Sequence, residues 1–307
     1  MLAKLLRTII LTMLLIGGGV GYGWQPFTLS VMANVLVMAA LGPFALLALI
    51  VGVSAVRSRS TIEPFAMWWR ALWGEYLASV QVFLRRQPWT SGTPGIQEAS
   101  ATPASPPRVP VVLVHGYLCN HRTWDTLAPA LRAQGHTVLA VNLEPLFTSI
   151  DHYAPCIETA VAQLCQHTGA SQVALVGHSM GGVAIRAWMR TNGTARVARV
   201  ITLGTPHSGT LGDPLPRSPN SIQMVWHSDW LHTLSANETD ATRALMRIAL
   251  TPQDNIVYPQ RAQVLPGVPV TVFEGIGHMQ LCLEPQPVAW VCDQLASTAA
   301  LAGADAT

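Results

Sequence analysis

The stretch Val173-Ala-Leu-Val-Gly-His-Ser-Met-Gly-Gly182 decides how the chain folds around it, because an apolar run meets a serine framed by glycines. The first four residues have the character of a buried strand, and a helix-compatible stretch follows the last glycine. A serine between strand and helix lies on a very tight turn that exposes its hydroxyl and crowds its neighbours. Gly177 and Gly181 therefore stand where a Cβ would clash. The pattern Gly177-x-Ser179-x-Gly181 predicts an exposed and reactive serine.

A serine hydroxyl is a poor nucleophile at neutral pH and needs a base that a carboxylate orients. After a serine of this kind, the acid and then the histidine follow in chain order. His278 comes after a β-branched run and Gly277, at the expected carboxyl end of a strand, where α/β active sites are built. Asp254 follows the apolar run 245–250 and a short turn. We predict Ser179, Asp254 and His278 as nucleophile, acid and base. The alternatives are a packed or surface histidine and a simple Asp-Asn turn.

Acyl chemistry at a serine also needs two backbone N–H groups that stabilise an oxyanion. The first is expected from Met180, the residue after the nucleophile. The apolar run 111–114 stops at His115-Gly116, so Tyr117 is expected to supply the second N–H while Gly116 lets the chain turn. His115 precedes the serine, and we interpret it as a residue that organises the loop.

From residue 108 onward, segments of strand and helix character alternate. Strands are expected at 109–114, 137–142, 172–176, 197–203, 245–250 and 268–273, and helices at 121–134, 154–167, 181–190 and 285–298. This alternation predicts an α/β fold with a mostly parallel sheet covered by helices on both faces. Segment 209–244 is a candidate lid. Its apolar residues have two possible roles: they cover or line the site, or they pack in the core of the domain. They are Met224, Trp226, Trp230, Leu231 and Leu234.

Taken in order, these motifs resemble the α/β-hydrolase superfamily and, within it, bacterial triacylglycerol lipases and esterases. The narrower resemblance is carried by Thr202 to Gly209, Gln223-Met224 with Ser228 to Leu231, and Asp254 to Pro259. It covers about residues 108–298 and implies a serine hydrolase that cleaves carboxylic esters, of a lipid-like kind, through an acyl-enzyme. An acyltransferase or a thioesterase would use the same triad. A non-catalytic membrane scaffold of the same fold is the alternative from another class.

Two apolar stretches open the sequence, from about Leu5 to Tyr22 and from Phe27 to about Val56. Only 11% of the residues are charged, against about 25% in a soluble domain, and a bilayer span needs about 20 apolar residues. The second stretch qualifies, whereas the first is shorter and glycine-rich, so a secretory signal peptide is its alternative interpretation. We prefer a transmembrane helical hairpin over 1–60, because a second span follows directly.

Basic residues flank this hairpin but are absent from its connecting loop. Lys4 and Arg7 lie at the beginning of the first stretch, and Arg57 and Arg59 follow the second. The positive-inside rule then predicts both ends in the cytoplasm. The catalytic domain is expected on the cytoplasmic side of a bacterial inner membrane, with a periplasmic location as the alternative if the first segment is cleaved.

The remaining segments complete the expected organisation. Residues 61–89 combine aromatic side chains with arginines, which favours an interfacial amphipathic helix, although a helix packed on the next domain is nearly as well supported. Residues 90–107 are rich in Ser, Thr, Pro and Gly and predict a flexible linker to a catalytic domain over 108–300.

Charge and cysteine usage exclude several other classes. The net charge of +2 and the absence of a basic stripe argue against nucleic-acid binding. The five cysteines show no metal-ligand spacing, and no calcium-ligand set of acidic residues stands out, so no metal and no cofactor are expected. The expected partners are a lipid or small ester substrate and the membrane, with no obligate protein partner inferred.

Overall fold

The computed structural model describes residues 1–25, 29–90, 92, 95–100, 108–212 and 217–304, and it places the side chains of these residues up to 298. In this part of the chain, six strands form one parallel sheet of order β2-β1-β3-β4-β5-β6. The strands are β1 (Val111–Val114), β2 (Val138–Ala140), β3 (Val173–His178), β4 (Val197–Leu203), β5 (Met246–Leu250) and β6 (Val270–Val272). The predicted parallel sheet is confirmed.

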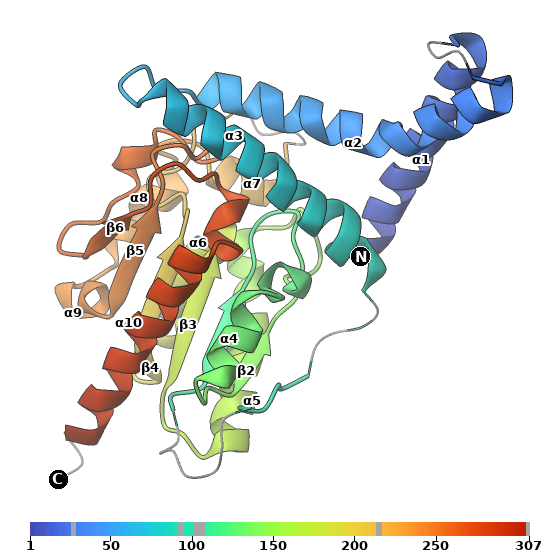
Figure 1. Cartoon of the computed structure of the whole chain (residues 1–307). Coiled ribbons are helices and arrows are strands. Elements are labelled where there is room, and N and C mark those ends of the chain that lie inside the picture. Colours follow the sequence, from blue (N-terminus) through green and yellow to red (C-terminus); the bar gives the residue numbers. More distant parts are fainter. Residues whose placement is uncertain (26–28, 91, 93–94, 101–107, 213–216, 305–307) are drawn as a thin grey trace.

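Helices cover both faces of this sheet, as the alternation of segments predicts (Figure 1). On one face lie α5 (Ala154–Thr168) and α6 (Met180–Asn192), and on the other lie α4 (Leu127–Ala133) and α10 (Pro285–Ala304). Successive side chains of a strand point to opposite faces, so β1 contributes Val112 and Val114 to the first core and Val111 and Leu113 to the second. All four are fully buried, as expected for a strand inside a parallel sheet.

The strand order reverses between β1 and β3. The chain leaves β1 for the outer strand β2 and then returns to β3 on the opposite side of β1. In open α/β sheets, ligands bind outside the carboxyl ends of the strands at such a switch point. The segments that follow β1 and β3 are therefore where the fold places a site.

Segment 209–244, whose residues 213–216 lie outside the described part, contains three short helices. They are α7 (Pro219–Gln223), α8 (Asp229–Ala236) and α9 (Asp240–Ala244). Met224, Leu231 and Leu234 are buried in the core on the α6 side of the sheet. Short 3₁₀ turns connect other elements: η3 (His121–Trp124), η4 (Ile150–Tyr153), η5 (Gln260–Ala262) and η6 (Met279–Cys282).

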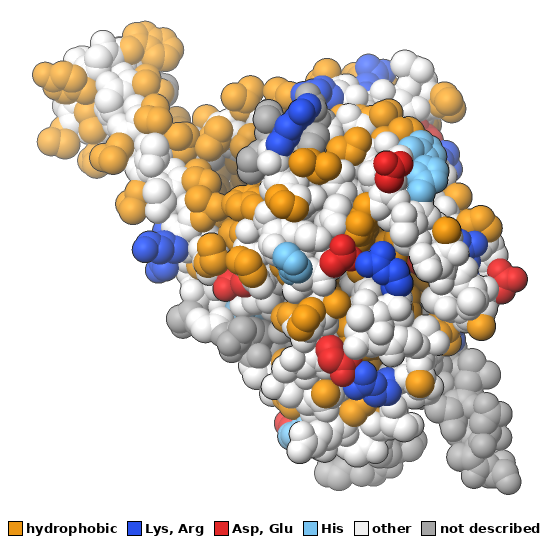
Figure 2. Space-filling view, turned by 180° about the vertical axis from the view of Figure 1, so that it is seen from behind, with side chains coloured by type: hydrophobic (Ala, Val, Ile, Leu, Met, Phe, Trp, Pro, Cys, Tyr) orange, Lys and Arg blue, Asp and Glu red, His pale blue; other side chains and the backbone are white. Residues whose placement is uncertain are grey.

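The N-terminal part is a helical hairpin of α1 (Leu2–Gly23) and α2 (Val31–Ser58), and α2 has Pro43 inside it. Glycines let the two backbones approach closely. A Cβ at Gly17 would lie 2.2 Å from the Met38 carbonyl oxygen, and one at Gly42 would lie 2.3 Å from that of Met13. Both helices are long and apolar enough to cross a membrane by length and composition. Hydrophobic side chains gather on the projecting hairpin, while charged side chains are scattered over the α/β part (Figure 2).

Helix α3 (Phe65–Ser79) lies beside α2 across one end of the α/β part (Figure 1) and continues as the π-helical η1 (Val80–Arg86) and the 3₁₀ turn η2 (Gln87–Trp89). The indole N–H of Trp68 donates to the Ala55 carbonyl and joins α3 to α2. One stripe of α3 is apolar and exposed, made by Phe65, Trp69, Trp73 and Leu77 at four-residue spacing. The opposite face, with Ala71, Glu75 and Ala78, is buried.

Most of segment 90–107, the predicted linker, lies outside the described residues. The described residue Gln97 forms an antiparallel bridge with Val138 at the outer edge of β2, through hydrogen bonds in both directions. The described part of the segment thus contacts the edge of the sheet at Gln97.

Candidate active site

Ser179 lies at the turn between β3 and α6, with φ 54° and ψ −126°. A non-glycine residue with positive φ is strained, and such strain is concentrated at functional sites. The flanking glycines make this turn possible. A Cβ at Gly177 would lie 2.6 Å from the Gly182 nitrogen, and one at Gly181 would lie 2.1 Å from the Val114 carbonyl oxygen. Backbone from β1 and α6 therefore fills the space that larger residues would need.

The loop after β1 packs directly on this serine. A Cβ at Gly116 would lie 2.8 Å from the Ser179 Cβ, so only glycine allows this contact. The backbone N–H groups of Tyr117 and Met180, one on each side of the switch point, donate to no other residue in the described part of the chain. Two free donors next to a serine hydroxyl are the arrangement that an oxyanion requires.

Asp254 and His278 form a buried pair at the carboxyl ends of β5 and β6. His278 Nδ1 lies 2.7 Å from Asp254 Oδ2, and both side chains are almost fully buried. The other oxygen, Oδ1, accepts the backbone N–H groups of Ile256 and Val257 at 2.8 and 2.7 Å, which fixes the carboxylate. Burial alone would lower the pKa of His278. The negative charge and hydrogen bond of Asp254, with the charge of Glu75, reverse this and raise the pKa of His278.

Two further histidines support the surrounding loops. His115 Nδ1 lies 2.9 Å from the Gly116 carbonyl oxygen, and its Nε2 accepts the Leu143 N–H at 2.9 Å. Burial lowers the pKa of His115 to about 4, so the ring is neutral and holds the β1 loop to the chain after β2. His178 Nε2 lies 3.2 Å from the His278 carbonyl oxygen, and the two rings are 4.6 Å apart.

Ser179 and His278 line the same cavity, which has a volume of about 480 Å³. Tyr117 and His178 also line it, so the predicted nucleophile, the predicted base and the second of the two predicted oxyanion residues share one space. In the described part of the chain, no hydrogen bond joins the Ser179 hydroxyl to His278.

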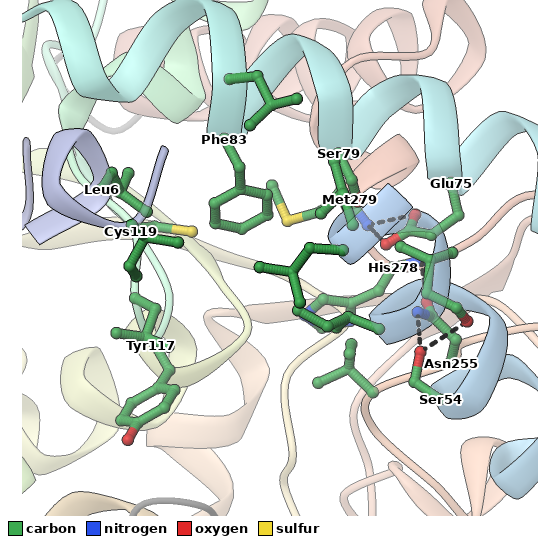
Figure 3. A pocket seen from close by; sticks show the side chains of 18 of the residues that line it. Leu6, Ser54, Glu75, Ser79, Phe83, Tyr117, Cys119, Asn255, His278 and Met279 are labelled. Carbon is green, nitrogen blue, oxygen red and sulfur yellow. Dashed lines mark hydrogen bonds between the residues drawn. The ribbon is translucent and has the colours of Figure 1, made fainter. Parts of the chain in front are cut away.

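The N-terminal helices contact both loops that carry the predicted acid and the predicted base (Figure 3). The Glu75 carboxylate of α3 accepts the Met279 N–H at 2.8 and 3.0 Å, one residue after His278. Ser54 of α2 accepts a hydrogen bond of 2.9 Å from the side-chain amide of Asn255, one residue after Asp254. Burial raises the pKa of Glu75 from 4.5 to about 7, against the opposing effect of His278.

Glu75 is the site residue that sequence reasoning missed. Two features of the sequence could have indicated Glu75. It is the single acidic residue within 65–89, and it lies on the helix face opposite the aromatic stripe. The predicted lid, segment 209–244, contributes no described residue to the lining of this cavity. Met224, Trp226, Trp230, Leu231 and Leu234 do not line it. Within the described residues, no group of His, Cys, Asp and Glu side chains is arranged to hold a metal ion.

Comparison with known proteins supports the same fold. Residues 109–234 match the family model of the alpha/beta hydrolase fold. The chain is 35% identical over 112 residues to triacylglycerol lipases of Pseudarthrobacter phenanthrenivorans and Burkholderia plantarii, a match that covers 34% of this chain and 34% and 31% of those lipases. The chain thus spans about a third of the length of these relatives.

The solved structure of the mature lipase BlEst2 of Bacillus licheniformis superposes with a TM-score of 0.56 and 17% identity, over 67% of this chain and 99% of that one. Aspergillus fumigatus lipase B superposes with a TM-score of 0.53 over 62% of this chain and 52% of that one, at 18% identity. At such identities the likeness concerns the fold. The chain has the α/β-hydrolase fold and resembles bacterial triacylglycerol lipases.

Proposed function

We propose that this chain is a membrane-anchored serine hydrolase that cleaves carboxylic esters, with Ser179, His278 and Asp254 as its triad. The observation that carries the proposal is the strained serine that shares a cavity with His278, whose Nδ1 is paired with the buried Asp254. The resemblance to triacylglycerol lipases supports esters as the substrate class.

In the proposed mechanism, Ser179 Oγ attacks the acyl carbonyl while His278 Nε2 accepts its proton. Asp254 holds the Nδ1 side of the ring and stabilises the imidazolium that forms. The N–H groups of Met180 and Tyr117 stabilise the oxyanion. His278 then protonates the departing alcohol, and a water molecule, activated by the same histidine, releases the acid and regenerates Ser179.

The anchor in this proposal is the α1–α2 hairpin. Its two helices meet the length and hydropathy of membrane spans, and their exposed surface is apolar. The exposed stripe of α3, with two tryptophans, suits the headgroup level of a bilayer. Basic residues at both ends of the hairpin favour a cytoplasmic location for the α/β part.

Hydrolysis of p-nitrophenyl esters of two to sixteen carbons, by the full chain in detergent or vesicles, tests this function. Ser179→Ala is expected to lower kcat by about 10⁶-fold, since the nucleophile is lost and only binding and the oxyanion donors remain. The matched control is Ser171→Ala, which removes an exposed hydroxyl just before β3.

Three outcomes are informative. Activity lost in Ser179→Ala and kept in Ser171→Ala supports the proposal, and a preference for long chains favours lipase over esterase. Hydrolysis that survives Ser179→Ala contradicts the assigned nucleophile. If the folded protein hydrolyses no ester, ester hydrolysis is rejected, and a thioesterase, an acyltransferase or a non-catalytic scaffold remains. Assays with thioesters and with alcohol acceptors then measure thioester hydrolysis and acyl transfer.

A further inference from the structure

We propose that the cavity at Ser179 is an acyl-chain site built in large part by the membrane hairpin, and that it takes its chain sideways from a bilayer lipid. This rests on the proposed function, because the chain must reach Ser179. It adds that α1 and α2 form the substrate site in addition to tethering the enzyme.

The lining of the cavity is divided by polarity. At the end near His278 lie Glu75 and Asn255, whose polar atoms are bonded to Met279 and Ser54. On the side away from them, Figure 3 shows Leu6 of α1 and Phe83 of η1. Figure 3 shows Tyr117 and Cys119 on the side of Leu6, so the hydrocarbon of α1 and η1 lies beside the oxyanion loop and the polar groups lie near His278. This arrangement matches an ester whose acyl part is a long chain.

The hairpin supplies most of the hydrocarbon wall. Residues of α1 and α2 that line the cavity recur on one face of each helix: Leu6, Ile10, Met13, Pro43, Leu47 and Val51. The volume of about 480 Å³ lies within the range of about 300–1,000 Å³ that is typical of small-molecule sites. Without the hairpin, the α/β part would lack this wall.

The outer side of the cavity lies on the lipid-facing surface of the hairpin. Leu5 and Ile9 of α1 and Ile50 of α2 line the cavity and are also 37%, 39% and 52% exposed. They stand on the two candidate membrane spans, where the surrounding medium is lipid acyl chains. An opening framed by such residues admits a lipid chain without passage through water.

Bulky substitutions inside the cavity test the site. Leu6→Trp and Leu47→Trp shorten the space for the acyl chain, whereas Leu15→Trp and Leu36→Trp make the same change on α1 and α2 at exposed positions that do not line it. Burial of one methylene changes an equilibrium by about fourfold. Displacing four methylenes should therefore lower the ratio of kcat/KM for p-nitrophenyl palmitate to that for the acetate by about 200-fold.

A photochemical measurement reads the same site without hydrolysis. Phosphatidylcholine with a diazirine in the middle of one acyl chain is placed in vesicles with the full-length Ser179→Ala variant, which leaves the ester intact. After illumination, labelled peptides are located by mass spectrometry. The inference predicts labels on Cys119 or Met279, which line the cavity from the α/β part. Adding Leu6→Trp and Leu47→Trp should remove these labels, and adding Leu15→Trp and Leu36→Trp should preserve them.

The outcomes separate this inference from the proposed function. A palmitate-to-acetate ratio unchanged by Leu6→Trp and Leu47→Trp, or labels confined to the outer faces of α1 and α2, would overturn the acyl site. Hydrolysis of palmitate only from detergent monomers, with no labelling from vesicles, would overturn lateral access. Labels in the cavity without hydrolysis of any ester would reject the proposed function and support the acyl site.

Discussion

At the scale of single residues, the buried pair Asp254–His278 depends on how each of its atoms is held. Both oxygens of Asp254 are occupied, Oδ1 by two backbone N–H groups and Oδ2 by His278 Nδ1. Gly204, with φ 56°, lies against the pair, since a Cβ there would be 3.1 Å from His278 Nδ1. The carboxylate therefore has one arrangement in which it orients the imidazole.

Asp254→Asn is expected to lower kcat by about 10⁴-fold, because an amide that donates to Nδ1 favours the wrong tautomer of His278. The comparison of kcat for wild type and variant on a short-chain ester measures this. Unchanged thermal unfolding would show that the loss is chemical. A decrease of less than about tenfold would contradict the role of Asp254 as the triad acid.

Glu75 links α3 to the pH dependence of the site. Above its own pKa of about 7, Glu75 is negatively charged and raises the pKa of His278, which acts as a base only when neutral. Glu75→Gln removes this charge, so the acidic limb of kcat/KM against pH should move to lower pH. Glu274→Gln, a change at an exposed glutamate in the loop before His278, is the matched control and should leave the limb in place. A limb that does not move in Glu75→Gln would show that Glu75 only supports the backbone.

At the scale of elements, the sequence predicted the strands and most helices of the α/β part, because the apolar residues that each of them buries recur within one short segment of sequence. Strand β4 has the predicted bounds 197–203. The predicted helix 121–134 instead divides into η3 and α4, which starts at Leu127. Pro129 explains the division, since proline is tolerated in the first turn of a helix and clashes in its interior.

The candidate site was predictable from the sequence only in part. Ser179, Asp254 and His278 follow strands, and chain order and turn residues indicate them. Ser54 and Glu75 enter the site only because α2 and α3 fold back over the α/β part, and they precede their partners Asn255 and Met279 by 201 and 204 positions. Such long-range contacts leave no periodic pattern in a single sequence.

The helices of segment 209–244 are attached to α6 by a buried ion pair. Arg186, fully buried on α6, donates to Glu238 between α8 and α9 and to Ser235 of α8. Glu238→Ala leaves this guanidinium without its counterion and should lower the free energy of unfolding by about 3–5 kcal/mol. Thermal or urea unfolding of the full chain measures the loss.

The control for this prediction is Glu274→Ala, which breaks the exposed pair with Arg261 and should cost about 0–1 kcal/mol. Equal losses in the two variants would show that the Arg186 pair does not hold this segment in place.

At the scale of the whole molecule, the hairpin and the α/β part meet at the cavity. Both α1 and α2 line the space that contains Ser179. Close packing of Gly17 and Gly42 against the opposite helix makes the hairpin one unit. The candidate membrane segment and the candidate catalytic centre are thus connected in two ways. Both line the same cavity, and Ser54 and Glu75 form hydrogen bonds to the loops that follow β5 and β6.

The proposed topology predicts which side of the membrane the α/β part occupies. An epitope tag fused after Thr307 should be removed by proteinase K in inverted inner-membrane vesicles and protected in spheroplasts, since basic residues flank both ends of the hairpin. The reverse pattern would place the domain in the periplasm.

The central claim is that Ser179 is an activated nucleophile, and covalent labelling with a fluorophosphonate probe tests it most directly. Attack by the Ser179 oxygen on phosphorus forms a P–O bond and releases fluoride. We expect one stable adduct on the peptide that contains Ser179, absent in Ser179→Ala and retained in Ser171→Ala. A folded protein that remains unlabelled, or a label on another residue, would contradict it.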